Sequence, residues 1–361
     1  MPWSSRSTGA AGRRTADFSG SRSERGSILV LVLLLMGVVV ALAVYGLRMA
    51  QVESSGAKIV EQRMRGRDLS ESGVRLAGFV LRKDLLQDRE RTRVDHPGEA
   101  WGSFPESGEV RLPQLKTGKL EGEIVDEQGK FPLNALLEGN GNWRSAYRRV
   151  LENLLIGHFG VSQSRAETVL SSLKDWMDPD QEPSGTRGAE SPYYRQQDKP
   201  WTCPNAPLRS VAELRLIRGV SQELYSGTED TAGLRELVTV HGDGEININT
   251  APEPLLAALV KQQESGISWN EARGFAEDMI RYREDRMHWD QLDDAQWWSN
   301  VAGALSVQMH PVTTTASSVF SVRVKASSGS VDTWSHAVLQ RNESGSEEDS
   351  PRVERIRYEV E

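Results

Sequence analysis

The chain has one cysteine, Cys203, in 361 residues, which excludes an internal disulfide. Its 6 histidines are scattered without metal-ligand spacing, and no serine occupies a Gly-x-Ser-x-Gly turn. Acidic residues outnumber basic ones by 51 to 43, which gives a formal net charge of −8 and disfavours contact with nucleic acid phosphates. These absences argue against an enzyme and against a disulfide-stabilised fold.

Charge is missing altogether from 28–47, a run of 20 mainly apolar residues. A helix of this length rises about 30 Å, which matches the hydrocarbon thickness of a bilayer. The preceding flank is basic, so by the positive-inside rule the N-terminus stays in the cytoplasm. This flank contains Arg6, Arg13, Arg14, Arg22 and Arg25 against Asp17 and Glu24. Residues 27–48 are therefore predicted to form a single transmembrane helix, with the rest of the chain on its outer side.

Residues 1–26 consist mainly of Ser, Gly, Arg and Ala without periodicity, which predicts a disordered leader. The leader has a net charge of +3, so the remainder of the chain has −11. In a secretory signal the small residue of the cleavage site follows the apolar run. Here Gly26 precedes the run, and cleavage after it would leave the apolar segment attached to the protein.

Beyond the apolar run, hydrophobic residues continue among charges, and no proline occurs before Pro97. The economical interpretation is one helix over 28–87, about 90 Å long. Its second half, 73–87, is predicted to pack on a folded head. A half-apolar, half-amphipathic helix of this length is typical of a filament subunit.

The Gly26–Ser27 junction and the long helix resemble the type IV pilin and pseudopilin family. This resemblance implies that a prepilin peptidase cleaves after Gly26 and methylates the new N-terminus, Ser27. Most members have a glutamate at the fifth mature position, where it offsets the terminal ammonium of a neighbouring subunit in the apolar filament core. The residue here is Leu31. A subunit without a charge at this position suits the end of a filament better than its shaft. Among pseudopilins, the missing glutamate is typical of the K-type minor pseudopilin of type II secretion, also called general secretion pathway protein K.

An internal repeat divides the middle of the chain. The segments GKFPLN at 129–134 and GEININ at 244–249 align at an offset of 115 residues, and Asp126 and Asp243 precede them. Each copy is predicted to form a turn, a short strand and a closing asparagine that starts or caps the next element. Such repeats mark duplicated supersecondary units.

Helices are predicted after both copies of the repeat. Capping-box sequences open two of them, Ser164 with Glu167 and Ser268 with Glu271. The first set covers 143–159, 164–177 and 211–217, and the second covers 254–260, 270–284 and 290–298. We expect two related helical units of the helix-hairpin-helix or SAM-like type, over 134–240 and 241–310.

Further segments also look like the K-type pseudopilin, so the resemblance extends from residue 26 to about residue 339. These segments are GEININTAP, DWMDPDQEP, PYY and LRSVAELRLIRGV. The stretch 216–220 also resembles a helix-hairpin-helix that grips DNA phosphates, with Gly219 beside Arg218 and Arg215. The acidic balance and the lack of a basic stripe argue against DNA binding.

The densest acidic cluster lies within 175–190. Carboxylates at alternate positions, Asp178, Asp180 and Glu182, could converge on a hard cation such as calcium. However, Pro183 stands where a calcium loop has glycine, and no glutamate occupies the twelfth position. By spacing alone, a metal site and a solvated acidic loop remain open. The resemblance implies calcium binding in this helical region, with the candidate ligands Asp175, Asp178, Asp180, Glu182 and Glu190.

After Pro311 the pattern alternates with period two over 319–326 and 331–339, which predicts a hairpin, and again over 352–361. The predicted fold class is α+β: a pilin-like long transmembrane helix packed on an antiparallel sheet, with a large all-helical insertion. The αβ domain would comprise 49–133 and 311–361.

These features predict a minor pseudopilin that caps or initiates the pseudopilus from the bacterial inner membrane, with its C-terminal domain in the periplasm. The resemblance implies the I-type and J-type minor pseudopilins, the major pseudopilin and the prepilin peptidase as partners. Two alternatives stay open: a minor pilin of a type IV pilus, and a membrane-anchored DNA-binding protein.

Overall fold

The computed structural model describes residues 21–88, 93–104, 119–242, 244–301, 304, 307–342 and 352–360, without the side chains of 21–26, 263–264, 342 and 352–360. Most of the predicted leader, Asp243 and residues 343–351 lie outside these residues. The chain divides into two compact units, Met1–Glu61 and Gln62–Glu361.

The first unit contains the beginning of helix α1, Ser21–Asp88, which is continuous as predicted. Its apolar side chains from Ile28 to Leu47 are exposed. By length and composition this helix could cross a membrane. An apolar helical surface of this length is of the kind that a lipid bilayer accommodates.

The second part of α1, in the other unit, has one buried face. Buried residues recur every three or four positions, as expected for a helix packed along one side. They include Leu69, Val74, Ala77, Leu81 and Leu85. The buried face of the helix begins at Gly66, seven positions before the start that was predicted, Gly73. A Cβ added to Gly73 would lie 2.7 Å from Val324 Cγ1, so this glycine lets the helix approach the sheet closely.

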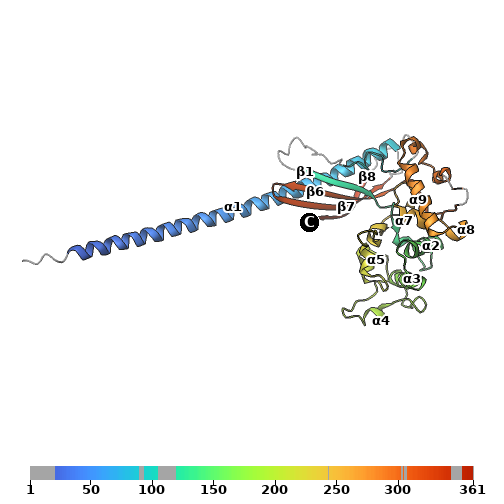
Figure 1. Ribbon diagram of the computed structural model, residues 1–361, viewed down its shortest axis with the longest axis horizontal. Coiled ribbons are helices and arrows are strands. Elements are labelled where there is room, and N and C mark those ends of the chain that lie inside the picture. The colour runs from blue at the N-terminus through green and yellow to red at the C-terminus, as the bar shows by residue number, and fades with distance from the viewer. Residues whose placement is uncertain are drawn as a thin grey trace, which may run out of the picture. The chain divides into compact units, whose positions relative to one another are not determined.

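The sheet has four antiparallel strands in the order β1, β6, β7, β8 (Figure 1). They span Lys119–Asp126, Val319–Ser328, Val331–Asn342 and Arg352–Val360. The β6–β7 hairpin is as predicted, and Gly329 at φ 61° supplies the left-handed residue of its turn. Strand β1 was not predicted. Its Leu120 and Ile124 join Phe320, Val322 and the α1 face in one hydrophobic core.

The helical region lies in sequence between strand β2, Phe131–Pro132, and strand β5, Thr313–Thr314, and has its own core (Figure 1). Its first part contains η1 Leu133–Ala135, α2 Ser145–Asn153, the π-helical turn η2 Leu154–His158, α3 Gln163–Met177, α4 Ser191–Tyr194, η3 Val211–Leu216, α5 Gln222–Ser226 and α6 Leu234–Leu237. Its second part contains α7 Glu253–Leu259, α8 Gln262–Ser265, α9 Trp269–Glu284, η4 Arg286–Gln291 and η5 Trp297–Asn300.

Two local predictions in this region were wrong. Helix α3 is capped by Ser162, whose hydroxyl accepts from Arg165 N, and Ser164 lies inside the first turn. Over 290–298 the chain forms the short 3₁₀ turns η4 and η5 in place of a helix. The capping box at Ser268 and Glu271 is present as predicted.

The two repeat segments occupy equivalent places in the fold. Strand β2, Phe131–Pro132, pairs in parallel with β3, Val238–Thr239, at the far end of the first helical part. Strand β4, Ile246–Asn247, pairs in parallel with β5, Thr313–Thr314, at the far end of the second. Each copy of the repeat therefore closes the helical segment that follows it.

The repeated asparagines join distant segments, and they do not cap the next element as predicted. Asn134 Nδ2 donates to the carbonyls of Leu208 and Val240, and its Oδ1 accepts from Leu208 N. Asn249 Nδ2 donates to the carbonyls of Leu292 and Thr315, and its Oδ1 accepts from Trp297 Nε1 at 2.7 Å. An amide suits both places because it donates and accepts at once.

Replacing Asn249 with leucine is expected to lower the free energy of unfolding by about 3–5 kcal/mol. The change leaves the Leu292 carbonyl and the Trp297 indole N–H buried without their partner, and each such group costs about 1–3 kcal/mol. The Thr315 carbonyl still accepts from Asp95 N. Urea unfolding of the full chain in detergent, followed by tryptophan fluorescence, measures the effect. The control is Asn140→Leu, an exposed asparagine, for which we expect a change within about 0.5 kcal/mol. Equal midpoints for the two variants would contradict the role of Asn249.

Candidate metal centre

The acidic cluster is built where helix α3 ends. Asp175 lies in the last turn, and Asp178 is the C-cap residue, with its N–H bonded to Lys174 O. Pro179 follows and ends the helix, since the residue before a proline disfavours the helical conformation. The chain then returns to Glu190, the residue that precedes α4. This return brings carboxylates that are 12 positions apart in sequence to one place.

Three of the five predicted ligands have carboxylate groups that lie close together. Asp178, Asp180 and Glu190 each offer a carboxylate oxygen, and these oxygens lie within 4.8 Å of one another. Asp178 and Glu190 are 1 % exposed, whereas Asp180 is exposed. Among the described residues, both Glu190 carboxylate oxygens and Asp178 Oδ1 are buried without a hydrogen-bond partner. Asp178 Oδ2 lies 3.0 Å from Lys174 Nζ.

The other two predicted ligands lie beside this group. Asp175 is buried; its Oδ1 accepts from Ser184 N at 2.8 Å, and its Oδ2 has no hydrogen-bond partner in the described chain. A Cβ on Gly188 would lie 2.2 Å from Asp175 Oδ2, so a glycine is needed where the loop passes this carboxylate. Glu182 is exposed, and its N–H donates to Asp180 Oδ1.

A further oxygen donor was missed by sequence reasoning. Asn205 has a left-handed backbone conformation with φ 48°, and its Nδ2 donates to the Asp180 carbonyl. Its Oδ1 is buried and has no hydrogen-bond partner in the described part of the chain. Asn205 is 25 positions from Asp180, and only its tolerance of the left-handed conformation could have drawn attention to it.

Burial raises the pKa values of the acidic groups in this cluster and of the nearby thiol. Desolvation, followed by the charges of Asp175 and Asp178, raises the pKa of Glu190 to about 7. Desolvation also raises the pKa of Asp178, although Lys174 opposes this shift. The pKa of the nearby Cys203 thiol rises to about 12, through burial and then the charge of Glu190. All these shifts report negative charge that the protein leaves uncompensated.

The donor set fits a calcium ion. Calcium takes six to eight oxygen ligands at about 2.3–2.6 Å, so two ligands on opposite sides of the ion stand about 5 Å apart. The oxygens of Asp178, Asp180 and Glu190 lie close enough together, within 4.8 Å, to share one such ion. Every candidate donor is a hard oxygen atom, the type that calcium prefers.

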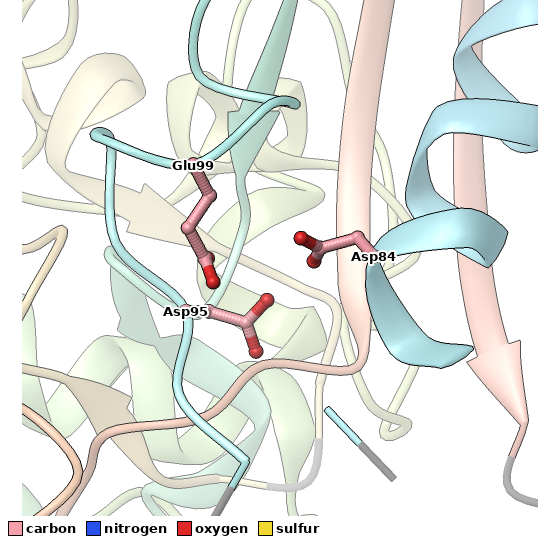
Figure 2. Close-up of side chains that lie close together, drawn as sticks. All are labelled: Asp84, Asp95 and Glu99. Atoms are coloured by element: carbon pink, nitrogen blue, oxygen red, sulfur yellow. The ribbon is translucent and has the colours of Figure 1, made fainter. Parts of the chain in front are cut away.

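A second acidic group has a cation of its own. Asp84, at the end of α1, and Asp95 and Glu99, from the loop that follows, point toward one another (Figure 2). Arg341 of β7 is fully buried between them: its Nη1 lies 3.0 Å from Asp84 Oδ2, and its Nη2 pairs with Asp95 Oδ1. Burial raises the pKa of Glu99 to about 8, so this group is mostly protonated at neutral pH. The guanidinium therefore pairs with both aspartates and compensates part of their charge.

The turn at Gly219, which resembles a DNA-binding hairpin in sequence, makes packing and hydrogen-bond contacts within the protein. A Cβ on Gly219 would lie 3.0 Å from Val169 Cγ2, so the turn packs directly on α3. Arg218 Nη1 donates to the carbonyls of Arg187 and Gly188, and its guanidinium lies 4.8 Å from the centre of the Tyr193 ring.

Known proteins resemble this chain in sequence and in fold. A family described as "Type II secretion system (T2SS), protein K" matches residues 129–240. Type II secretion system protein K of Pseudomonas aeruginosa is 32% identical over 198 residues, which cover 52% of this chain and 53%, about half, of that protein. The protein of the same name from Pectobacterium carotovorum subsp. carotovorum is 26% identical over 290 residues, which cover 76% of this chain and 79% of that protein.

A solved structure shares the fold. In the GspK-GspI-GspJ complex from enterotoxigenic Escherichia coli, one chain matches with a TM-score of 0.60 and 20% sequence identity, over 84% of this chain and 99% of that chain. Family model, sequence relatives and fold agree on the protein that this chain resembles, which is type II secretion system protein K.

Proposed function

We propose that this protein is a minor pseudopilin at the tip of the type II secretion pseudopilus, where it initiates or caps assembly for protein export. It is anchored in the inner membrane by the first part of α1, and its sheet and helical region lie in the periplasm. The prepilin peptidase cleaves it after Gly26 and methylates Ser27. The similarity to type II secretion system protein K and the apolar start of α1 support this assignment.

The proposed position at the tip rests on Leu31, an uncharged residue at the fifth position after the cleavage site. In a filament core, an uncompensated terminal ammonium is costly, and a carboxylate at the fifth mature position offsets it. The sequence has no acidic residue anywhere in 28–47. This subunit therefore has no carboxylate here to pair with the N-terminal ammonium of a neighbouring subunit. That absence suits a position at the end of the filament better than one in the shaft.

The helical insertion favours the same place. It separates β2 from β5 by about half of the chain and has a hydrophobic core of its own. We infer that so large a head blocks the addition of further subunits above it. Because GspK forms a complex with GspI and GspJ in the solved structure, we propose the I-type and J-type minor pseudopilins as partners, and the major pseudopilin below them.

Deletion of the gene tests this function. The proposal predicts that type II substrates accumulate in the periplasm and disappear from the medium, and that the full chain restores their export. Type IV pili on the cell surface, counted in the same strains, should not change. Loss of surface pili with normal export would instead establish a minor pilin of a type IV pilus.

We further propose that the centre formed by Asp178, Asp180 and Glu190 binds calcium, with Asp175 and Asn205 supplying additional oxygens. The buried carboxylate oxygens without partners support this proposal, because an orphaned buried charge is costly unless a cation compensates it. Bound calcium would hold the end of α3 against the start of α4 and so order the loop between them.

Calcium is expected to bind the full chain in detergent with saturable heat in calorimetry, and to stabilise it by about 2.7 kcal/mol at a concentration 100-fold above the dissociation constant. Asp178→Ala combined with Asp180→Ala should abolish the saturable heat. The control is Glu229→Ala combined with Asp230→Ala, which removes the same charge from exposed residues of another loop. No heat from the parent protein, or equal heat from both double variants, would reject the site.

Calcium affinity is expected to rise about tenfold between pH 6 and pH 8. Glu190 has a pKa of about 7 without the ion, and the ion requires the ionised carboxylate, so binding near pH 7 releases a proton. In the calcium-free protein the raised pKa makes the folded state bind more protons than the unfolded state. Stability should therefore fall as pH rises from about 4.5 to about 7, and calcium should restore it. Calorimetry and thermal unfolding across this range measure both effects, and a pH-independent affinity would contradict the role of Glu190.

A further inference from the structure

A second hollow lies between the two parts of the helical region, away from the acidic centre. Its cavity volume is about 210 Å³, room for about seven water molecules at their volume in the liquid. One wall comes from α2 and the π-helical turn η2, through Arg149, Asn153 and Ile156. The other comes from Lys261 and from Trp269 at the start of α9. The labels of α2, α8 and α9 locate this region in Figure 1.

The π-helical turn shapes the pocket. It departs from the i→i+4 pattern of α2, with Phe159 N donating to Leu154 O. Turns of this kind occur frequently at functional sites. Within the turn, a Cβ on Gly157 would lie 2.2 Å from the Trp269 ring, so only glycine lets the indole lie against the turn. The result is an apolar surface, formed by Ile156 and Trp269, beside polar groups.

The charged residues that line the pocket are basic. Arg149, Lys261 and His310 line the pocket, and no acidic residue appears among the described lining residues. The side chains of Arg149 and Lys261 form no ion pair or hydrogen bond within the described part of the chain. By contrast Arg148, one position earlier, pairs with Glu152 and Glu167. The pocket therefore places two cations, Arg149 and Lys261, together without an acidic residue among its described lining.

We propose that this pocket binds a carboxylate carried on a short carbon chain, either a free dicarboxylate or an acidic side chain of a peptide. The Arg149 guanidinium offers paired donors that match a carboxylate, and Lys261 adds a point charge from the opposite wall. Trp269 and Ile156 cover the carbon chain. This apolar surface distinguishes the ligand from bare phosphate, which would leave it uncovered.

Fluorine NMR of the full chain in detergent, labelled with 5-fluorotryptophan, tests the proposal. The Trp269 signal is assigned by its absence in Trp269→Phe. Glutarate should shift this signal saturably, whereas glutaramide, its neutral counterpart, should not. Arg149→Gln and Lys261→Gln should each weaken glutarate binding at least fivefold, since each removes a charged donor. Arg209→Gln, an exposed arginine without a side-chain partner in the described chain, should bind as the parent does.

The source of the carboxylate is settled by adding acetyl-Gly-Glu-Gly-amide. Binding as tight as that of glutarate, or tighter, assigns an acidic peptide, and binding of glutarate alone assigns a free dicarboxylate; both support the proposal. The signals of the other tryptophans report whether each variant is folded. No saturable shift with either probe, equal binding of glutaramide, a response to inorganic phosphate but not to glutarate, or folded variants that bind as the parent would each overturn it.

Discussion

Replacing Arg341 with methionine is expected to lower the free energy of unfolding by about 3–5 kcal/mol, the usual cost of removing one partner from a buried ion pair. The side chain of Arg341 is 0 % exposed, and its partners Asp84 and Asp95 are 5 % and 0 % exposed. Without the guanidinium, the two carboxylates remain buried and must lose their charge or draw in water. Urea unfolding of the full chain in detergent measures the loss.

The matched control is Arg323→Met, which removes the same charge from a surface pair. Arg323 and Glu123 are 56% and 54% exposed, and such pairs contribute at most about 1 kcal/mol. Equal losses for the two variants would show that Arg341 does not hold the end of α1 to β7.

Replacing Gly26 with valine is expected to leave the protein entirely uncleaved and to abolish its function in export. The family resemblance implies a peptidase that requires glycine at this position, and glycine alone lets the backbone approach a catalytic site without a Cβ. Intact-mass spectrometry of membrane extracts measures the outcome. The parent should lack residues 1–26 and carry one methyl group on Ser27, whereas the variant should retain its leader.

The control for processing is Gly20→Val, which changes a glycine of the leader six positions upstream of the cleavage site. This variant should be cleaved and should support export as the parent does. Cleavage of the Gly26 variant at its normal position, or a parent protein that keeps its leader, would contradict the assignment of this junction.

Features with a local signal were predictable from the sequence. The period of the apolar residues and the absence of proline located α1, and alternation located β6 and β7. The capping box at Ser268 was found because Glu271 stands three positions later. The same rule failed at α3, where Ser162 and Ser164 are both candidate caps and the backbone places Ser162 outside the helix.

Features that depend on distant contacts were not predictable. Arg341 lies 257 positions from Asp84 and 246 from Asp95, so no spacing rule connects them. The acidic cluster was recognised from composition, but its geometry depends on a loop that brings Glu190 back to Asp178, and on Asn205 beyond it. The repeated asparagines carried a signal, but their partners could be identified only once Val240 and Thr315 were placed at the ends of their segments.

The tip position is the central claim, and immunogold labelling of pseudopili isolated from cells tests it most directly. With an epitope tag on this protein and a second tag on the major pseudopilin, we predict that the first label marks one end of each filament and that the second label follows the shaft. The glutamate variant Leu31→Glu should be able to enter the shaft more readily than the parent. Labelling of the parent protein along the whole shaft would contradict the account.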